Sequence, residues 1–181
     1  MESSGLKHIH VALLLVVALV MSGCAATRPV SGASAAGSGD IASWSAADCR
    51  NARKVIVRTA RSRIGCPYRN AGKGPSAFDC SGLTAFAYNA AGLALKPTSS
   101  QQFTQGKFLG KHGILKPGDL VFFGGSKDTK TVSHVGIVVS YRRSDGSFTF
   151  IHAANTGVEI QKSTASYYKK RYLGARRILA Y

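Results

Sequence analysis

Residues 78–92 read FDCSGLTAFAYNAAG, and this stretch decides the fold. Apolar residues recur at helical spacing from Leu83 to Ala90 and Gly92 ends the pattern, so we predict a helix over residues 81–91. Cys80 stands at the start of this helix, behind a loop rich in glycine and proline. The free N–H groups of a helix N-terminus favour negative charge, so we expect a lowered pKa for the Cys80 thiol.

A second helix is predicted upstream, over residues 45–64. Ser45 can cap its N-terminus, and Asp48 lies in the first turn, where the helix dipole favours negative charge. Apolar residues spaced four apart, from Ala52 to Ile64, form a stripe that a helix would bury. Gly65 stops the helix, and many of its other positions carry Arg or Lys.

Downstream of these helices the hydrophobic pattern changes to short runs rich in β-branched and aromatic residues. The predicted strands cover residues 119–123, 132–140, 147–152 and 158–161. Short turn sequences separate the last three strands, so neighbouring strands run antiparallel. The order of helices first and strands second predicts the α+β class, with N-terminal helices packed on an antiparallel sheet in one domain.

The predicted order of strands makes two histidines candidate partners for Cys80. His134 and His152 lie on consecutive strands, and direct pairing would centre the turn near residue 143. The turn sequence Asp145–Gly146 comes later, so a bulge or a longer loop is expected, with the imidazoles still within diagonal reach. One histidine can then take the thiol proton while the other orients it, and backbone N–H groups near Cys80 can stabilise an oxyanion.

Two other interpretations of these residues stay open. A cysteine and two histidines could ligate zinc, although a fourth ligand and a closely spaced pair such as CxxC are missing. The same side chains could also serve packing alone. Cys49 and Cys66 flank the first predicted helix, which would hold them roughly 25 Å apart. We therefore expect no disulfide between them and regard both as small buried residues.

Composition restricts the class of protein further. The chain has 181 residues, and its 24 Lys+Arg against 8 Asp+Glu give a net charge of +16. A hydrophobic content of 45 % is enough for a buried core, and four cysteines are too few for a disulfide scaffold. The excess of positive charge indicates an anionic partner, such as nucleic acid, anionic lipid or an acidic polymer.

The N-terminus has the features of a targeting segment. The apolar run from Val11 to Met21 is too short to span a bilayer but fits the core of a secretory signal. Ser22–Gly23–Cys24 follows it and resembles the bacterial lipoprotein signal, with an ordinary signal peptide as the alternative. We predict a signal peptide over residues 1–23, lipidation of Cys24 and a flexible tether over residues 24–44. Ala25 resembles the pattern of outer-membrane lipoproteins that face the periplasm.

Five segments together carry a resemblance to a known family. Each segment is a weak signal alone, but they occur in one order between about Val55 and Arg177. They are Gly65–Tyr68, Phe78–Leu83, Leu115–Phe123, His134–Ile137 and Phe150–Ala153. In this combination the sequence resembles the NlpC/P60 family of cell-wall peptidases, and the resembling domain would cover residues 45–181.

The resemblance implies a papain-like α+β fold and hydrolysis of peptide bonds in peptidoglycan stem peptides. By position, Cys80 matches the nucleophile, His134 the general base and His152 the orienting residue. Tyr68 matches a tyrosine that lines the site, whereas Asp79 and Ser81 match residues that shape the substrate pocket. Residues 97–102 resemble a segment that borders the cleft. Asn70–Ala71–Gly72 departs from the family, where a Gly-Gly pair is usual.

The function expected from the sequence is therefore a peptidoglycan (murein) endopeptidase that cuts stem-peptide or cross-link amide bonds through a cysteine thioester. An amidase or acyltransferase with the same chemistry, and a wall-binding lipoprotein without activity, are the alternatives. We expect a monomer with no cofactor and no metal, anchored to a membrane through Cys24 and not bound to nucleic acid. The basic runs 50–63 and 169–177 are expected to hold the enzyme on its anionic polymer.

Overall fold

A computed structural model of the protein describes residues 43–180, so the predicted signal peptide, Cys24 and nearly all of the tether lie outside the described part. The helices are α1 (Ala46–Arg61), α2 (Cys80–Asn89), α3 (Ser99–Gln102) and α4 (Ser166–Arg171). The strands are β1 (Lys107–Gly110), β2 (Leu120–Gly124), β3 (Val132–Tyr141), β4 (Phe148–Ala154), β5 (Gly157–Lys162) and β6 (Tyr172–Arg177). Among the helices of residues 43–180, none has the length and hydrophobicity needed to cross a membrane.

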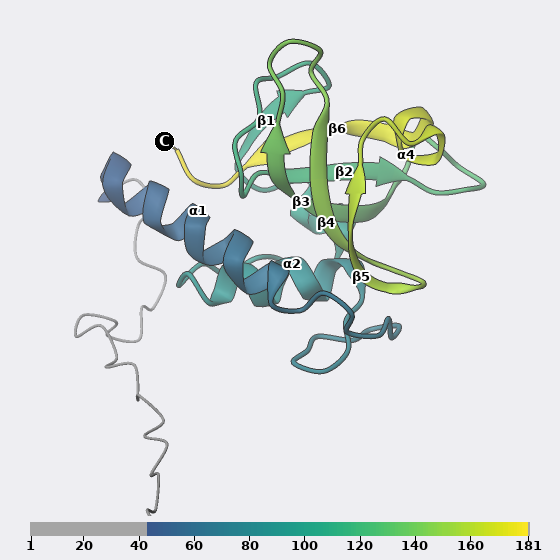
Figure 1. The fold of residues 1–181 in the computed structure, drawn as a ribbon, viewed down its shortest axis with the longest axis horizontal. Coiled ribbons are helices and arrows are strands. Elements are labelled where there is room, and N and C mark those ends of the chain that lie inside the picture. The colour runs from purple at the N-terminus through teal and green to yellow at the C-terminus, as the bar shows by residue number, and fades with distance from the viewer. Residues whose placement is uncertain (1–42, 181) are drawn as a thin grey trace, which may run out of the picture. The chain divides into compact units, whose positions relative to one another are not determined.

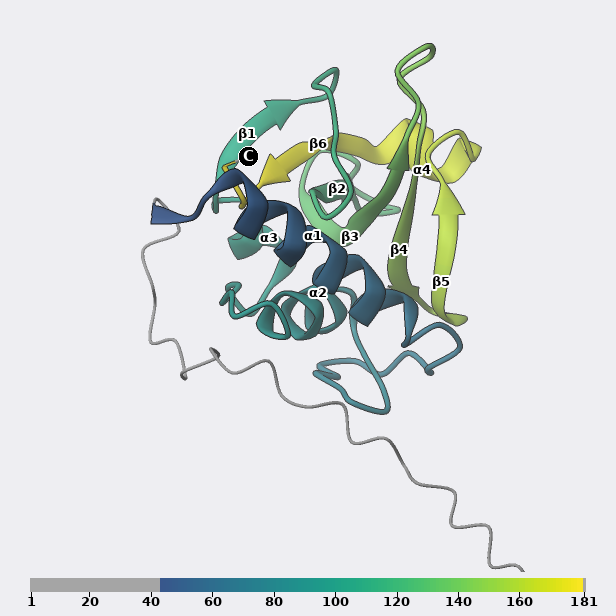
Figure 2. The same ribbon diagram turned by 60° about the vertical axis from the view of Figure 1, so that its left-hand side comes forward.

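The six strands form one sheet in the order β1-β6-β2-β3-β4-β5, and every neighbouring pair is antiparallel. Helices α1 and α2 pack against each other, and α2 packs on β3 and β4, so that both lie on one side of the strands (Figures 1 and 2). Between these layers lies a core that includes Ile56, Leu83, Phe122 and Ile151. The predicted α+β class, with helices packed on an antiparallel sheet, is confirmed.

Helix α1 begins as its sequence predicts. Ser45 is the N-cap, and a capping box joins it to Asp48 through hydrogen bonds in both directions. The helix ends at Arg61, earlier than expected, because residues 62–65 form a tighter turn and Gly65 adopts a positive φ of 85°. Helix α1 is unbroken from Cys49 to Arg61, and Cys49 and Cys66 both carry free thiols. Cys49 is buried as expected, whereas Cys66 is only partly buried.

The sequence did not predict β6, although it is an internal strand between β1 and β2. Its sequence, YLGARR, contains a glycine and two arginines and lacks the run of β-branched and aromatic residues that is typical of a strand. Gly174 has a φ of 132°, and a Cβ atom there would lie 2.9 Å from the ring of Phe108. Glycine therefore lets the neighbouring strand approach closely. Because glycine has a low strand propensity, the same residue made this segment look unlike a strand in the sequence.

A buried carboxylate joins the helix layer to the sheet. Asp119 is fully buried at the start of β2 and accepts hydrogen bonds from Arg53 of α1 at 3.0 Å and from Arg177 of β6 at 2.7 Å. Arg53 also donates to the carbonyl oxygens of Pro117 and Leu179. Arg53 and Arg177 belong to the basic runs that were expected to contact an anionic polymer, and instead they stabilise the fold.

Replacing Asp119 by alanine would leave two arginines without their buried partner. We predict that Asp119→Ala lowers the free energy of unfolding by about 3–5 kcal/mol, measured by urea denaturation. The exposed Asp128 is a matched control, and Asp128→Ala should change the free energy of unfolding by less than about 0.5 kcal/mol. Equal effects of the two substitutions would contradict the structural role of Asp119.

Candidate active site

The N-terminus of α2 is built by Asp79 and Cys80. The helix begins at Cys80, one residue before the predicted start, and Asp79 is its N-cap. The Asp79 carboxylate accepts a hydrogen bond from the N–H of Gly82 at 2.5 Å, which satisfies one of the free donors of the first turn. Gly82 is required here because a Cβ atom would lie 2.0 Å from the carbonyl oxygen of Gly72.

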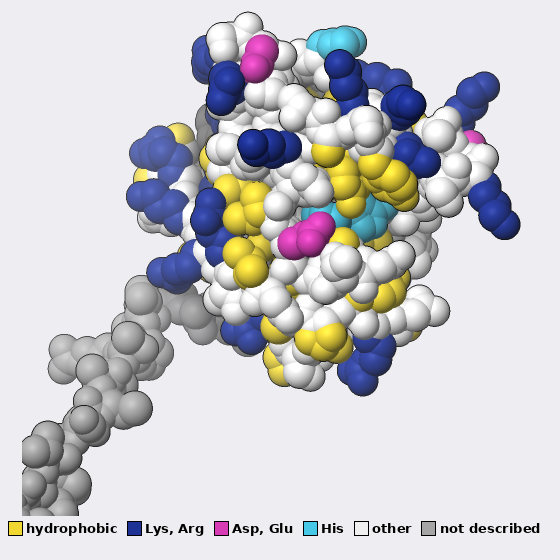
Figure 3. Space-filling view, turned by 45° about the vertical axis from the view of Figure 1, so that its right-hand side comes forward, with side chains coloured by type: hydrophobic (Ala, Val, Ile, Leu, Met, Phe, Trp, Pro, Cys, Tyr) yellow, Lys and Arg dark blue, Asp and Glu magenta, His cyan; other side chains and the backbone are white. Residues whose placement is uncertain are grey.

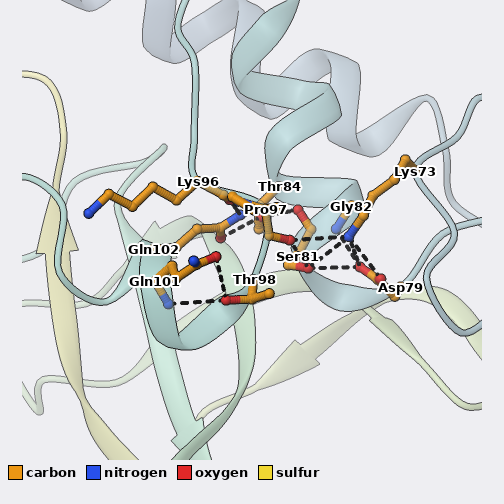
Figure 4. Close-up of polar contacts among 10 residues, drawn as sticks. All are labelled: Lys73, Asp79, Ser81, Gly82, Thr84, Lys96, Pro97, Thr98, Gln101 and Gln102. Carbon is orange, nitrogen blue, oxygen red and sulfur yellow. Dashed lines mark hydrogen bonds and ion pairs between the residues drawn. The ribbon is translucent and has the colours of Figure 1, made fainter.

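Lys73 completes a polar network around this helix start (Figure 4). Its ammonium group lies 3.0 Å from the Asp79 carboxylate and 3.2 Å from the Ser81 hydroxyl, and it also donates to the carbonyl oxygen of Pro97. The Ser81 hydroxyl donates to the Asp79 carboxylate at 2.9 Å. The Asp79 charge is thus already compensated within the protein, by a lysine that no sequence pattern had indicated as its partner.

The loop between α1 and α2 is held in a specific conformation. Ala71 is the only non-glycine residue with positive φ among residues 43–180, with a φ of 55°. This is the position where the sequence departs from the Gly-Gly pair of the resembling family. An L-residue in this conformation costs about 1–2 kcal/mol, so the surrounding contacts impose it. The N–H of Asp79 donates to the carbonyl of Gly72, which fixes the loop to the start of α2.

Helix α3 supports α2 from the side. Gln102 is fully buried, and its amide nitrogen donates to the carbonyl oxygens of Ser81 at 3.2 Å and Lys96 at 2.9 Å. Its amide oxygen accepts a hydrogen bond from Thr84. Thr98 caps α3, so the segment 97–102 acts as a brace for the helix that carries Cys80 (Figure 4).

The two histidines meet across β3 and β4. Nε2 of His134 lies 2.9 Å from Nδ1 of His152, and their rings are perpendicular. A bulge interrupts the pairing between Val138 and Ser140, and continuing the register from Ile137 and Ile151 places Gly136 opposite His152. The bulge and the diagonal contact were both predicted from the position of the turn, and both are confirmed.

Gly136 makes the diagonal contact possible. A Cβ atom at this position would lie 2.7 Å from the Phe150 ring and 3.3 Å from Cβ of His152. A larger residue would therefore push β4 away from β3 where the two imidazoles come together.

Cys80, His134 and Tyr68 line one cavity of about 660 Å³. Its wall also includes Phe123 and Glu159. Figure 3 shows a face of the molecule on which a histidine and an acidic side chain lie together among hydrophobic side chains, with most Lys and Arg farther out. The structure thus brings together the three predicted reactive residues and Tyr68.

Asp79 and Ser81 are not among the residues that line this cavity. Both are buried beside Lys73, at the base of the helix start. A role for them in binding substrate stays a prediction, and their contacts give them a structural role in holding Cys80.

Burial determines the protonation states in the cavity. It raises the pKa of the Cys80 thiol above its ordinary value of 9.0, outweighing the backbone N–H groups of Val135, Ser81 and Cys80 that favour the thiolate. The lowered pKa expected from the helix N-terminus is therefore wrong for this site. Burial also lowers the pKa of His134 to about 4. Burial and the neighbouring His134 lower the pKa of His152 to about 3.

These shifts leave a neutral thiol beside a neutral imidazole at pH 7. A neutral His134 is able to accept a proton, and Nδ1 is the nitrogen available because Nε2 contacts His152. Within residues 43–180 no group of three or more His, Cys, Asp or Glu side chains has the geometry to hold a metal ion. Such an arrangement can supply a nucleophile, a base and a group that orients the base.

Three further residues of the cavity were missed in the sequence. Glu159 comes from β5, and Tyr167 and Tyr168 come from α4. The register of β5 puts Glu159 directly opposite His152, which only the strand pairing reveals. The two tyrosines directly precede the basic run 169–177. Two consecutive aromatic residues were the only sequence feature that could have indicated them as cavity residues.

The structure is an α+β domain in which a thiol at a helix N-terminus and two paired histidines on an antiparallel sheet come together, an arrangement that can support nucleophilic chemistry. The profile of the NlpC/P60 family matches residues 65–177. The chain belongs to the NlpC/P60 family.

Relatives and solved structures agree with this assignment. Murein DD-endopeptidase MepH of Escherichia coli is 35 % identical over 149 residues, covering 80 % of this chain and 52 % of that protein. A probable endopeptidase of Corynebacterium glutamicum is 36 % identical over 129 residues, covering 71 % of this chain and 56 % of that protein. The chain therefore spans about half the length of these relatives. An NlpC/P60 family protein from Bacillus cereus has a TM-score of 0.61 and 32 % identity, covering 70 % of this chain and 40 % of that chain.

Proposed function

We propose that the protein is a peptidoglycan endopeptidase that hydrolyses amide bonds of stem peptides or cross-links, with Cys80 as the nucleophile. The observation that carries the proposal is the cavity that Cys80 shares with His134, whose Nε2 lies 2.9 Å from Nδ1 of the buried His152. The names of its relatives, murein endopeptidases among them, support the substrate class.

In the first half of the reaction, Nδ1 of His134 takes the proton of the Cys80 thiol as the sulfur attacks the amide carbonyl carbon. Backbone N–H groups of the first turn of α2 stabilise the negative oxygen of the tetrahedral intermediate. The C–N bond then breaks, and the amine leaves with the proton that His134 holds. The product of this half is a thioester between Cys80 and the acyl part of the peptide.

In the second half, water hydrolyses the thioester. His134 takes a proton from the attacking water, and a second tetrahedral intermediate forms in the same place. The C–S bond breaks, the peptide leaves as a carboxylic acid, and His134 returns its proton to the sulfur of Cys80. His152 keeps the ring of His134 in the orientation that both halves need.

The reaction is tested by digestion of purified peptidoglycan. We predict that Cys80→Ala releases no muropeptides and that iodoacetamide inactivates the wild-type chain, whereas chelators leave it active. Mass spectrometry of the products identifies the bond that is cut and separates an endopeptidase from an amidase or an acyltransferase. Full activity of Cys80→Ala would refute the mechanism, and wall binding without cleavage by the wild-type chain would indicate a non-catalytic lipoprotein.

The anchoring of the enzyme forms the second part of the proposal. The sequence Ser22–Gly23–Cys24 after an apolar run supports export as a lipoprotein, with Cys24 lipidated and the domain facing the periplasm from the outer membrane. Labelling with a fatty acid analogue should mark the wild-type chain and not Cys24→Ala. The variant should also leave the outer-membrane fraction, whereas equal labelling of both chains would contradict the anchor.

A further inference from the structure

The two ring nitrogens of His152 have different partners. The side chain is fully buried, and its Nδ1 is engaged with His134. Its Nε2 faces the hydroxyl of Tyr168 at 3.5 Å and Oε1 of Glu159 at 3.7 Å. A buried N–H needs an acceptor, so the groups that face Nε2 decide whether the proton of His152 resides there.

Glu159 is held in place by the strands around it. It pairs with His152 in the β4–β5 register, and the hydroxyl of Thr156 donates to its Oε2 at 3.1 Å. Its side chain is 41 % exposed, and it lines the cavity that contains Cys80. The carboxylate therefore lies between the buried histidine and the open part of the cavity.

The proposed proton transfer from Cys80 determines which ring nitrogens of His134 and His152 carry protons. His134 can take the proton of Cys80 at Nδ1 only if its own proton is on Nε2. That N–H then donates to Nδ1 of His152, which must be unprotonated. A neutral His152 consequently carries its proton on Nε2, where Glu159 and Tyr168 lie.

The two groups at Nε2 differ in what they can do. An ionised carboxylate only accepts hydrogen bonds, whereas a phenol can donate or accept. Burial raises the pKa of Tyr168 to about 12, so its hydroxyl stays protonated and allows either tautomer of His152. Glu159 allows only the tautomer that leaves His134 Nδ1 free.

We propose that Glu159 is a positioning residue that fixes the Nε2–H tautomers of His152 and His134 and stabilises the positive charge that forms on the pair during catalysis. The catalytic part rests on the proposed function, whereas the tautomers are properties of the folded chain. At 3.7 Å the contact is longer than a hydrogen bond, and we expect it to shorten when the imidazolium forms. The charged and titratable groups that line the cavity with His134 are Glu159 of β5, Tyr167 and Tyr168 of α4, Cys80 of α2 and Tyr68 of the loop before α2.

The tautomers are measured by NMR of the purified chain labelled with ¹⁵N-histidine. We expect His134 and His152 of the wild-type chain to carry their protons on Nε2 at pH 7. In Glu159→Leu we expect a detectable fraction of His152 with the proton on Nδ1. A proton on Nδ1 of His152 in the wild-type chain would overturn the proposal, and this result does not depend on any substrate.

Kinetics on a soluble stem peptide test the catalytic part. We expect Glu159→Leu to lower kcat about tenfold to a hundredfold with KM changed less than about twofold. Glu159→Gln keeps an oxygen that can accept a hydrogen bond from His152 but removes the negative charge. We expect it to retain the Nε2–H tautomers and to have a lower kcat than the wild-type chain. Asp145→Asn removes the same charge from an exposed loop outside the cavity and should leave kcat unchanged.

Two kinetic outcomes would overturn this role. The first is an increase of KM at constant kcat in the Glu159 variants, because Glu159 would then bind substrate rather than orient His152. The second is an unchanged kcat in both variants. Should the wild-type chain cleave no peptidoglycan bond, the proposed function fails while the tautomer measurement still decides the role of Glu159 in the fold.

Discussion

The placement of the site depends on the buried carboxylate of Asp119. Its two arginine partners come from α1 and β6, and the hydroxyl of Tyr88 in α2 donates to the carbonyl of the adjacent Gly118. This cluster fixes both long helices relative to the central strands. Because Cys80 belongs to α2 and the histidines to β3 and β4, the same contacts determine where the thiol lies relative to the imidazoles. Loss of the carboxylate is costly because the charges of the two arginines would lose the anion that compensates them.

Much of this architecture could be predicted because its signals are local. The Ser45 cap, the apolar period of α2 and the position of the turn before β4 each depend on residues close in sequence, and the turn position was enough to predict the diagonal histidine contact. Strand β6 was missed because Gly174 weakens its pattern, while the need for that glycine arises from a neighbouring strand. Glu159 was missed for a related reason, since its place opposite His152 depends on pairing between β4 and β5.

Charge shows the same division between local pattern and tertiary structure. A helix N-terminus predicts a stabilised thiolate, yet burial of Cys80 outweighs that effect and raises the pKa of the thiol. The basic runs predict a surface for an anionic polymer, yet Arg53 and Arg177 are the partners of Asp119. In both cases the tertiary surroundings decide the outcome: burial at Cys80, and the buried Asp119 carboxylate at the two arginines. Burial thus favours a neutral Cys80 thiol and a neutral His134 imidazole in the same cavity.

The central claim is therefore that Cys80 is a protonated thiol in the free protein, and its ionisation tests that claim directly. Thiolate absorbs in the ultraviolet, so the difference in absorbance between the wild-type chain and Cys80→Ser, followed through a pH titration, reports Cys80 alone. We predict that the thiolate signal has its midpoint above pH 9.0, because burial raises the pKa of the thiol. A thiolate signal already present near pH 6 would contradict the account, since it would require a preformed pair of thiolate and imidazolium.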